Sequence, residues 1–139
     1  MPLYGINKRF RHYDWKVAQD VLQTICTKHT RALDIGCGDG RRIIIHEELV
    51  DLLISVDIDL SKLRRTKAKG IQVVRADATK LPFEDGSFDV VTSFHAIEHI
   101  NDDLSLLNEM HRVLNKGGHA LVLTPNRRRL SSIYYRVFQ

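Results

Sequence analysis

The chain has 139 residues, a length typical of one domain that buries its own hydrophobic core. Its composition, 43% hydrophobic and 27% charged, is ordinary for a soluble globular protein. No apolar run approaches the ~18 residues of a membrane-spanning helix, and the first residues lack the apolar region of a secretory signal. Two cysteines are too few for a disulfide framework, so we expect one cytoplasmic domain with reduced thiols. The net charge of +4 permits an anionic partner without indicating one.

Helix-like and strand-like hydrophobic periods alternate along the chain. Apolar residues at helical spacing predict a first helix over 14–28, with Asp14 as its N-cap. The other predicted helices cover 41–49, 61–69 and a segment that starts after Asn101 or Asp102 and stops at Gly117 and Gly118. The predicted strands cover 31–35, 52–58, 71–77, 88–94 and 119–124. Strands that alternate with helices predict an α/β fold, a Rossmann-like parallel sheet of about five strands with helices on both faces.

Three glycines follow the first predicted strand in the stretch LDIGCGDG (33–40). A dinucleotide-binding fingerprint would place its third glycine at position 41, which is Arg41. Asp34, which precedes the glycines, would also repel a pyrophosphate. The stretch therefore favours a ligand that is rich in hydrogen-bond donors and carries positive charge.

Acidic residues end the first three predicted strands: Asp34, Asp57 and Asp77. Ligands of an open parallel sheet bind outside the carboxyl ends of its strands, so we expect these carboxylates to converge on one edge. Asp57 can accept bonds from both ribose hydroxyls, Asp77 from the amine of adenine, and Asp34 can attract an ammonium group through water. Adenosine that carries an amino-acid tail and a sulfonium is S-adenosylmethionine.

Four motifs, in this order, resemble those of class I S-adenosylmethionine-dependent methyltransferases of the type 11 kind: LDIGCGDG, SVDIDLSKL, RADATKLPFEDGSFDVVTSFHAIEHI and RVLNKGGHALVLTPN. The resemblance implies a truncated core of this family, with S-adenosyl-L-methionine as cofactor and S-adenosyl-L-homocysteine as product. The resemblance also implies which residues hold each part of the cofactor. Asp34, Gly36 and Gly38 would hold the methionyl part, Asp57 the ribose, and Ile58, Asp77 and Ala78 the adenine. We add Ser93 at the end of the fourth strand.

The stretch HAIEH (95–99), after the fourth strand, contains the candidate catalytic residues. H-x-x-E-H is also a zinc-peptidase signature, but that site needs a later acidic ligand and none follows Glu109. The stretch further resembles the divalent-metal motif of small-RNA 2′-O-methyltransferases and ubiquinone-pathway O-methyltransferases, with His95 in place of an acid. Because hard cations prefer oxygen ligands, we predict no metal. We expect His99, Glu98 or His95 to take the acceptor's proton, with His99 favoured, or His99 to pack beneath the cofactor.

We expect a single domain over 1–139, with a cap helix in 1–30, the cofactor-binding core in 31–126 and a basic amphipathic tail in 127–139. Apolar residues at helical spacing predict a helix in the tail, which covers the sheet, binds a partner or membrane surface, or contacts RNA. Members of the family continue past the fifth strand with a helix and two antiparallel strands, and we expect the last two strands to be missing here. The fifth strand would then be an exposed edge, unless the tail covers it or a second copy in a homodimer or a partner chain pairs with it; otherwise the chain is a fragment.

The sequence thus predicts a methyltransferase (EC 2.1.1.-) that transfers a methyl group to an oxygen or nitrogen of a small molecule, an RNA or a protein. The alternative is a non-catalytic S-adenosylmethionine-binding or scaffold subunit that a partner chain completes, and a nicotinamide-dependent enzyme is a distant third. Tyr13 and Trp15 either close over the sulfonium by cation–π contact or anchor the first helix.

Overall fold

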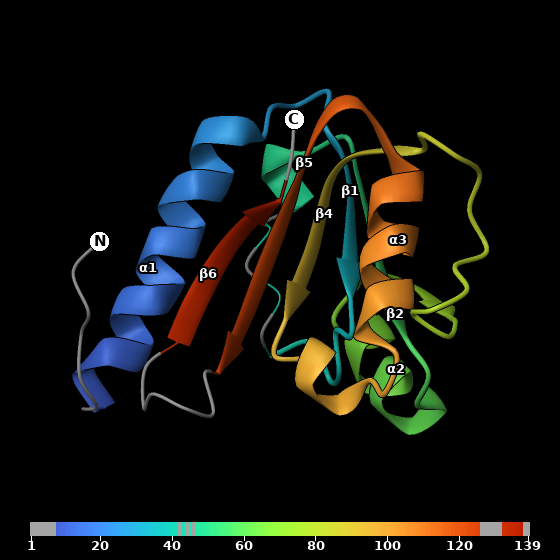
Figure 1. The fold of residues 1–139 in the computed structure, drawn as a ribbon, viewed down its shortest axis with the longest axis horizontal. Helices are drawn as coiled ribbons and strands as arrows, with labels where there is room; N and C mark the ends of the chain where they lie inside the picture. Colours follow the sequence, from blue (N-terminus) through green and yellow to red (C-terminus); the bar gives the residue numbers. More distant parts are fainter. Residues whose placement is uncertain (1–7, 42, 44, 46, 126–131, 138–139) are drawn as a thin grey trace.

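The computed structural model describes residues 8–41, 43, 45, 47–125 and 132–137. They form a six-stranded sheet with the order β3-β2-β1-β4-β5-β6 (Figure 1). The strands are β1 (Arg31–Ile35), β2 (Leu52–Asp57), β3 (Gln72–Arg75), β4 (Phe88–Phe94), β5 (Leu114–Pro125) and β6 (Ser132–Val137). The first five pair in parallel, which confirms the predicted Rossmann-like sheet, and the strand order reverses between β1 and β4. The ligand site of such a sheet lies outside the strand ends near that reversal.

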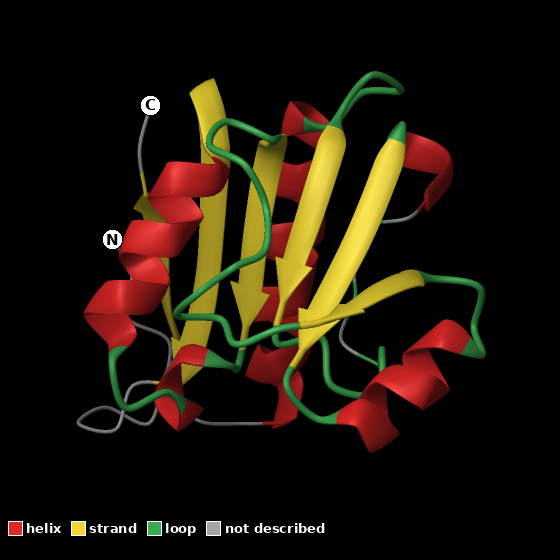
Figure 2. Ribbon diagram, turned by 90° about the vertical axis from the view of Figure 1, so that its right-hand side faces the viewer, coloured by secondary structure: helices red, strands yellow, loops and turns green. Residues whose placement is uncertain are grey.

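Helices lie on both faces of the sheet (Figure 2), because residues along each strand alternate between two cores. One core, which includes α1 (Lys8–Ile25), contains Ala18, Leu22, Ala32, Leu53, Val90, Phe94 and Leu123. The other, which includes α3 (Asp103–Val113), contains Leu33, Ile35, Val91, Leu106, Met110 and Val113. The third helix, α2 (Leu60–Lys67), buries Leu63 and Thr66. Among the described residues, no helix is long and apolar enough to cross a membrane.

The helices differ from the predicted ones at several ends. α1 begins at Lys8, so Asp14 lies inside the helix and is not its N-cap. Asp102 is the N-cap of α3, as predicted, and accepts a hydrogen bond from the Ser105 N–H at 2.9 Å. Within 41–49, the described residues contain only the short 3₁₀ turn η1 (Glu47–Leu49) in place of the predicted helix. The sequence there has three consecutive isoleucines at 43–45, and β-branched side chains lower helix propensity slightly.

The predicted helix stop at Gly117 and Gly118 is also wrong. α3 ends at Val113, and both glycines lie inside β5, where the pairing of β5 with β4 shifts register. Gly117 has a φ of +85°, and a Cβ on Gly118 would lie 2.9 Å from the Asp89 carbonyl oxygen. The glycines therefore serve a bulge in the strand.

The tail does not form the predicted helix. Residues Ser132–Val137 form β6, antiparallel to β5, with Ala120 opposite Val137 and Pro125 opposite Ser132. Strand β6 thereby satisfies backbone groups of β5 that would otherwise be unpaired. The fifth strand is consequently not the sheet edge. Of the predicted alternatives, the tail covers it, and the expectation of an exposed fifth strand with no antiparallel neighbour is wrong. The three arginines at 127–129 lie outside the described residues.

Candidate functional site

The glycine loop after β1 is tied to β2 and α2. The N–H groups of Gly36 and Cys37 both donate to the Val56 carbonyl oxygen, at 2.8 and 3.1 Å. From α2, the buried Thr66 hydroxyl donates to the Gly38 carbonyl oxygen at 3.0 Å. These three hydrogen bonds therefore attach the loop to β2 and α2.

Two of the loop glycines are required for different reasons. Gly36 has a φ of +74°, and a Cβ there would lie 2.3 Å from the Cβ of Ala96, on the segment that leaves β4. Gly38 has a φ of +58°, but a Cβ there would meet no atom within 4 Å. Gly36 thus allows the loop to lie directly against the end of β4, whereas Gly38 is favoured only because its φ is positive.

Asp57, at the end of β2, holds the loop from the other side. One carboxylate oxygen accepts the Gly38 N–H at 2.8 Å, and the other accepts the Asp59 N–H at 2.9 Å. Each oxygen has a second lone pair, and the residue is half-buried, so both oxygens can accept a further bond from a ligand. Ile58, the next residue, is 62% exposed and offers an apolar surface beside them.

Asp34 lies beneath the loop and is only 4% exposed. It lies in register with Ser55 on β2 and Thr92 on β4, and the Thr92 hydroxyl donates to its carboxylate at 2.6 Å. Burial raises the pKa of Asp34 to about 7, with the bond from Thr92 opposing the rise and the charge of Asp57 adding to it. A cation bound nearby would favour its ionised form.

Asp77 and Ala78 follow β3. The Ala76 N–H donates to the Asp57 carbonyl oxygen at 3.1 Å, so this segment lies beside the end of β2. Asp77 is exposed, and its carboxylate accepts bonds from the backbone N–H and the hydroxyl of Thr79, at 2.8 and 2.7 Å. These bonds, the backbone one first, lower the pKa of Asp77. Asp77 is therefore an oriented carboxylate at the predicted adenine end of the site.

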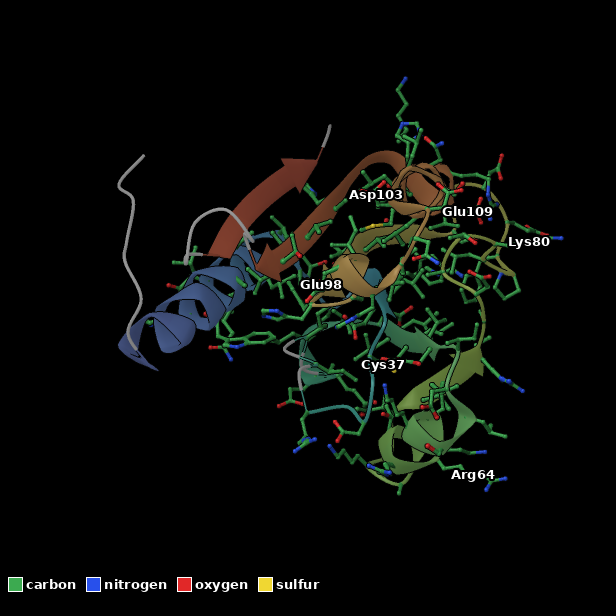
Figure 3. The ribbon with its side chains drawn as sticks, turned by 60° about the horizontal axis from the view of Figure 1, so that its bottom comes forward. Cys37, Arg64, Lys80, Glu98, Asp103 and Glu109 are labelled. Atoms are coloured by element: carbon green, nitrogen blue, oxygen red, sulfur yellow. The ribbon has the colours of Figure 1, made fainter. Side chains whose placement is uncertain are left out.

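The loop after Asp77 is held by two residues that the sequence analysis missed, Arg112 and Glu109 of α3. Glu109 accepts the Leu81 N–H at 2.7 Å, and Arg112 donates to the carbonyl oxygens of Leu81 and Phe83 at 3.1 and 2.7 Å. The two side chains bond each other at 2.7 and 2.8 Å, which raises the pKa of Arg112 and lowers that of Glu109. Figure 3 shows Glu109 beside the loop that carries Lys80. Glu109 and Arg112 are three residues apart on a predicted helix, a spacing that favours an ion pair, and this was the signal in the sequence that could have revealed them.

The three candidate catalytic residues do not share one environment. His95 and Glu98 are half-buried, and Nδ1 of His95 lies 3.6 Å from a carboxylate oxygen of Glu98. His99 is exposed at the end of the 3₁₀ turn η2 (Ile97–His99). Figure 3 shows Glu98 and Cys37 on the segments that leave β4 and β1. Across the part of the chain that is described, no three His, Cys, Asp or Glu side chains are grouped to hold a metal ion.

Ser93 and Trp15 are two further residues that the sequence analysis placed near the site. Ser93 is fully buried, and its hydroxyl has no hydrogen-bond partner among the described residues, although it is the last residue but one of β4. Trp15 packs with its ring centroid 5.5 Å from that of Phe94 and 5.9 Å from that of His95. These contacts support its role as an anchor of α1. The side chain of Tyr13 lies outside the described part of the structure.

A cavity of about 270 Å³ lies elsewhere, between α3 and β5. Its lining includes Met110, His111, Asn115 and Lys116. Most of these residues belong to the end of α3 and the start of β5, away from the carboxyl ends of the strands. The cavity is therefore separate from the glycine loop and the three aspartates.

Comparison with known proteins shows the class of protein to which this fold belongs. Residues 33–122 match the family defined by the methyltransferase domain. The chain belongs to this family, which confirms the predicted resemblance to class I S-adenosylmethionine-dependent methyltransferases.

Individual relatives agree. The chain is 31% identical over 141 residues to a demethylmenaquinone methyltransferase of Staphylococcus epidermidis, covering 91% of this chain and 58% of that protein. The crystal structure of the YcgJ protein of Bacillus subtilis superposes with a TM-score of 0.74 at 28% identity, covering 81% of this chain and 50% of that one. The crystal structure of an S-adenosylmethionine-dependent methyltransferase of Mesorhizobium loti superposes with a TM-score of 0.65 at 30% identity, covering 77% of this chain and 53% of that one. The chain thus spans little more than half the length of these proteins.

Proposed function

We propose that the chain binds S-adenosylmethionine at the carboxyl ends of β1, β2 and β3 and donates its methyl group to an oxygen or nitrogen of an acceptor. The observation that carries the proposal is the pairing of Asp57 with Gly38 at 2.8 Å. It orients a half-buried carboxylate and fixes the glycine loop with one bond. Both parts that would hold the ribose and the methionyl tail are therefore in place together.

The assignment of residues follows the order of the strands. Asp57 accepts the ribose hydroxyls and Ile58 lies against the adenine, since its side chain is the exposed apolar group beside that carboxylate. Asp77 and the Ala78 amide bind the adenine edge. Gly36 and Gly38 contact the methionyl part, with Asp34 below them and Ser93 as a further proposed contact.

S-adenosylmethionine supplies an activated methyl group, and the product is S-adenosylhomocysteine. The transfer is an in-line displacement that disperses positive charge, so the protein acts mainly by holding the reacting atoms in line. An oxygen or nitrogen acceptor must also lose a proton. His95, Glu98 and His99 stand at the end of β4, one residue or more beyond the strand, and are the proposed proton acceptors.

The alternative function, a non-catalytic S-adenosylmethionine-binding or scaffold subunit, was motivated by an exposed fifth strand. β6 occupies that edge, so this observation no longer favours the alternative. For the acceptor we favour a small molecule over RNA or protein, because the Staphylococcus epidermidis relative is named for demethylmenaquinone.

The proposal is tested by calorimetric titration of residues 1–139 with S-adenosylmethionine and with S-adenosylhomocysteine at pH 7.5. We expect binding by the unaltered chain and its loss in Asp57→Ala. The matched control is Asp51→Ala, because Asp51 is an exposed acid beside the opposite end of β2. No binding by the unaltered chain, or equal binding by Asp57→Ala, would overturn the proposal.

A further inference from the structure

The carboxyl ends of β4 and β5 hold a second group of polar side chains, beside the glycine loop. Glu98 lies between two partners: one carboxylate oxygen is 3.6 Å from Nδ1 of His95, and the other accepts the Thr124 hydroxyl at 3.0 Å. The side chains of His95 and Glu98 are only 20% and 17% exposed. The Trp15 ring lies 5.9 Å from the imidazole ring of His95. The His95 ring is thus bordered by a carboxylate and an indole.

The backbone of His95 is unusual. Its φ is +54°, and no other described residue except glycine has a positive φ. The His95 N–H donates to the Leu123 carbonyl oxygen at 2.7 Å, which ties this residue to β5 immediately after β4 ends. A left-handed conformation is uncommon at residues other than glycine, although histidine adopts it more often than most, and sparsely populated backbone conformations cluster at functional sites. The chain turns at His95, and Glu98, three residues further on, accepts the Thr124 hydroxyl of β5.

The orientation of the imidazole determines which of its nitrogens is basic. When Nδ1–H points at a carboxylate, the lone pair of the neutral ring is on Nε2. The distance of 3.6 Å is longer than a hydrogen bond, and such contacts in a catalytic site commonly shorten when ligands bind. Thr124 limits the rotation of Glu98 by holding its other oxygen. Nδ1 is thus the ring nitrogen on the side of Glu98, which makes Nε2 the proposed proton acceptor.

The group also lies next to the proposed methyl donor. Ala96 follows His95 and lies so close to Gly36 that a Cβ on the glycine would be 2.3 Å from the alanine Cβ. The loop that contacts the methionyl part is therefore one residue away from His95. His99 is exposed at the far end of η2, and no contact of its side chain draws it to the loop in the described structure.

We propose that His95 is the base of the methyl transfer, that Glu98 orients its ring, and that Thr124 is a positioning residue for Glu98. This inference rests on the proposed function and, among the three candidate residues, prefers His95 to His99. It also assigns the acceptor class: a hydroxyl or an amine that still carries its proton when it binds, since an ionised carboxylate or a thioether needs no base.

The proposed step is balanced. The acceptor's O–H or N–H bond breaks as its O–C or N–C bond to the methyl group forms, and the sulfur–methyl bond breaks with its electron pair left on sulfur. Nε2 of His95 receives the proton and later releases it to water. No oxidant, reductant or metal is needed.

The test is a nitrogen–proton NMR titration of the histidine side chains of residues 1–139, between pH 5 and 9, with and without S-adenosylhomocysteine. We expect the neutral His95 ring to carry its proton on Nδ1. Glu98→Gln removes the negative charge beside the ring and should weaken its proton affinity about tenfold. Thr124→Val should weaken it less, and Thr124→Ser, which keeps the hydroxyl, should restore it. His99→Gln assigns the neighbouring signal and should leave His95 unchanged.

A proton on Nε2 of the unaltered protein would overturn the inference without any variant. So would an unchanged His95 titration in Glu98→Gln, with the backbone amide spectrum showing that the variant is folded. Calorimetry with S-adenosylhomocysteine on the same samples separates the two proposals. If the unaltered chain and all the variants bind S-adenosylhomocysteine but the His95 titration does not respond to Glu98→Gln, only the role of His95 is refuted. If the unaltered chain does not bind, the proposed function itself is refuted.

Discussion

Asp57 accepts the backbone N–H of Gly38 at 2.8 Å, so the acidic end of β2 and the glycine loop after β1 form one unit. The second oxygen of Asp57 accepts the Asp59 N–H at 2.9 Å, at the entrance to α2. A single carboxylate therefore orders two segments around the proposed cofactor. The stability of this end of the sheet and the affinity for the cofactor should depend on the same side chain.

Asp57→Ala should lower the free energy of unfolding even without a ligand. The change leaves the N–H groups of Gly38 and Asp59 without their acceptor, and because water can reach this half-buried position we expect a loss of about 1–2 kcal/mol. Urea denaturation of the unliganded chain measures it, with Asp51→Ala as the control. Equal stability of the two variants would show that water replaces the carboxylate fully.

Gly36→Ala should be much more disruptive than Gly38→Ala. Both positions have positive φ values, for which a side chain costs roughly 1–2 kcal/mol, but only Gly36 lies against Ala96. Overpacking adds about 1–3 kcal/mol there. The decisive measurement is a double-mutant cycle: Ala96→Gly in the Gly36→Ala background should recover the overpacking part, because the next atom, the Cα of residue 96, is 3.6 Å away. Strict additivity of the two changes would contradict the contact.

Asp34 should make the unliganded protein less stable as the pH rises from about 4 to 8. Burial raises its pKa to about 7, so in this window the folded state binds a proton that the unfolded state has already lost. The stabilisation present at low pH is then lost as the pH rises through 7, by up to ~4 kcal/mol for a shift of this size. Comparing Asp34→Asn with the unaltered chain by urea denaturation at several pH values isolates this residue. A difference between them that is constant with pH would argue against the raised pKa.

Arg112→Met should loosen the loop after Asp77. The variant loses donors to the Leu81 and Phe83 carbonyl oxygens and leaves Glu109 without its cation, for an expected loss of about 2–4 kcal/mol. Arg112→Lys should not restore it, because an ammonium group lacks the planar set of donors. Hydrogen exchange at the Leu81 amide, which donates to Glu109 at 2.7 Å, reports the loop directly. Unchanged protection there would contradict this role.

The sequence by itself determined the parallel core of the fold and the acidic ends of its strands. Hydrophobic periods are local, and each marks the face that a strand or helix buries, so the order of the elements and the placement of Asp57 and Asp77 at strand ends follow from short windows. The ordered motifs also predicted the family. The N-cap Asp102 was predictable for the same reason, because a cap acts within one turn.

Only the tertiary structure decided the features that depend on contacts distant in the chain. The tail has a helical period, but pairing with β5 satisfies a row of backbone groups that no local pattern records, so it forms β6. The sequence motif gives no reason to prefer His95 or His99. In the structure, His95 lies beside Glu98, which accepts the Thr124 hydroxyl from the neighbouring strand, whereas His99 is exposed. Likewise, Arg112 holds its loop through carbonyl oxygens 29 and 31 residues away. Such hydrogen bonds form only after the sheet has brought the segments together, which is why the residue pattern alone could not predict them.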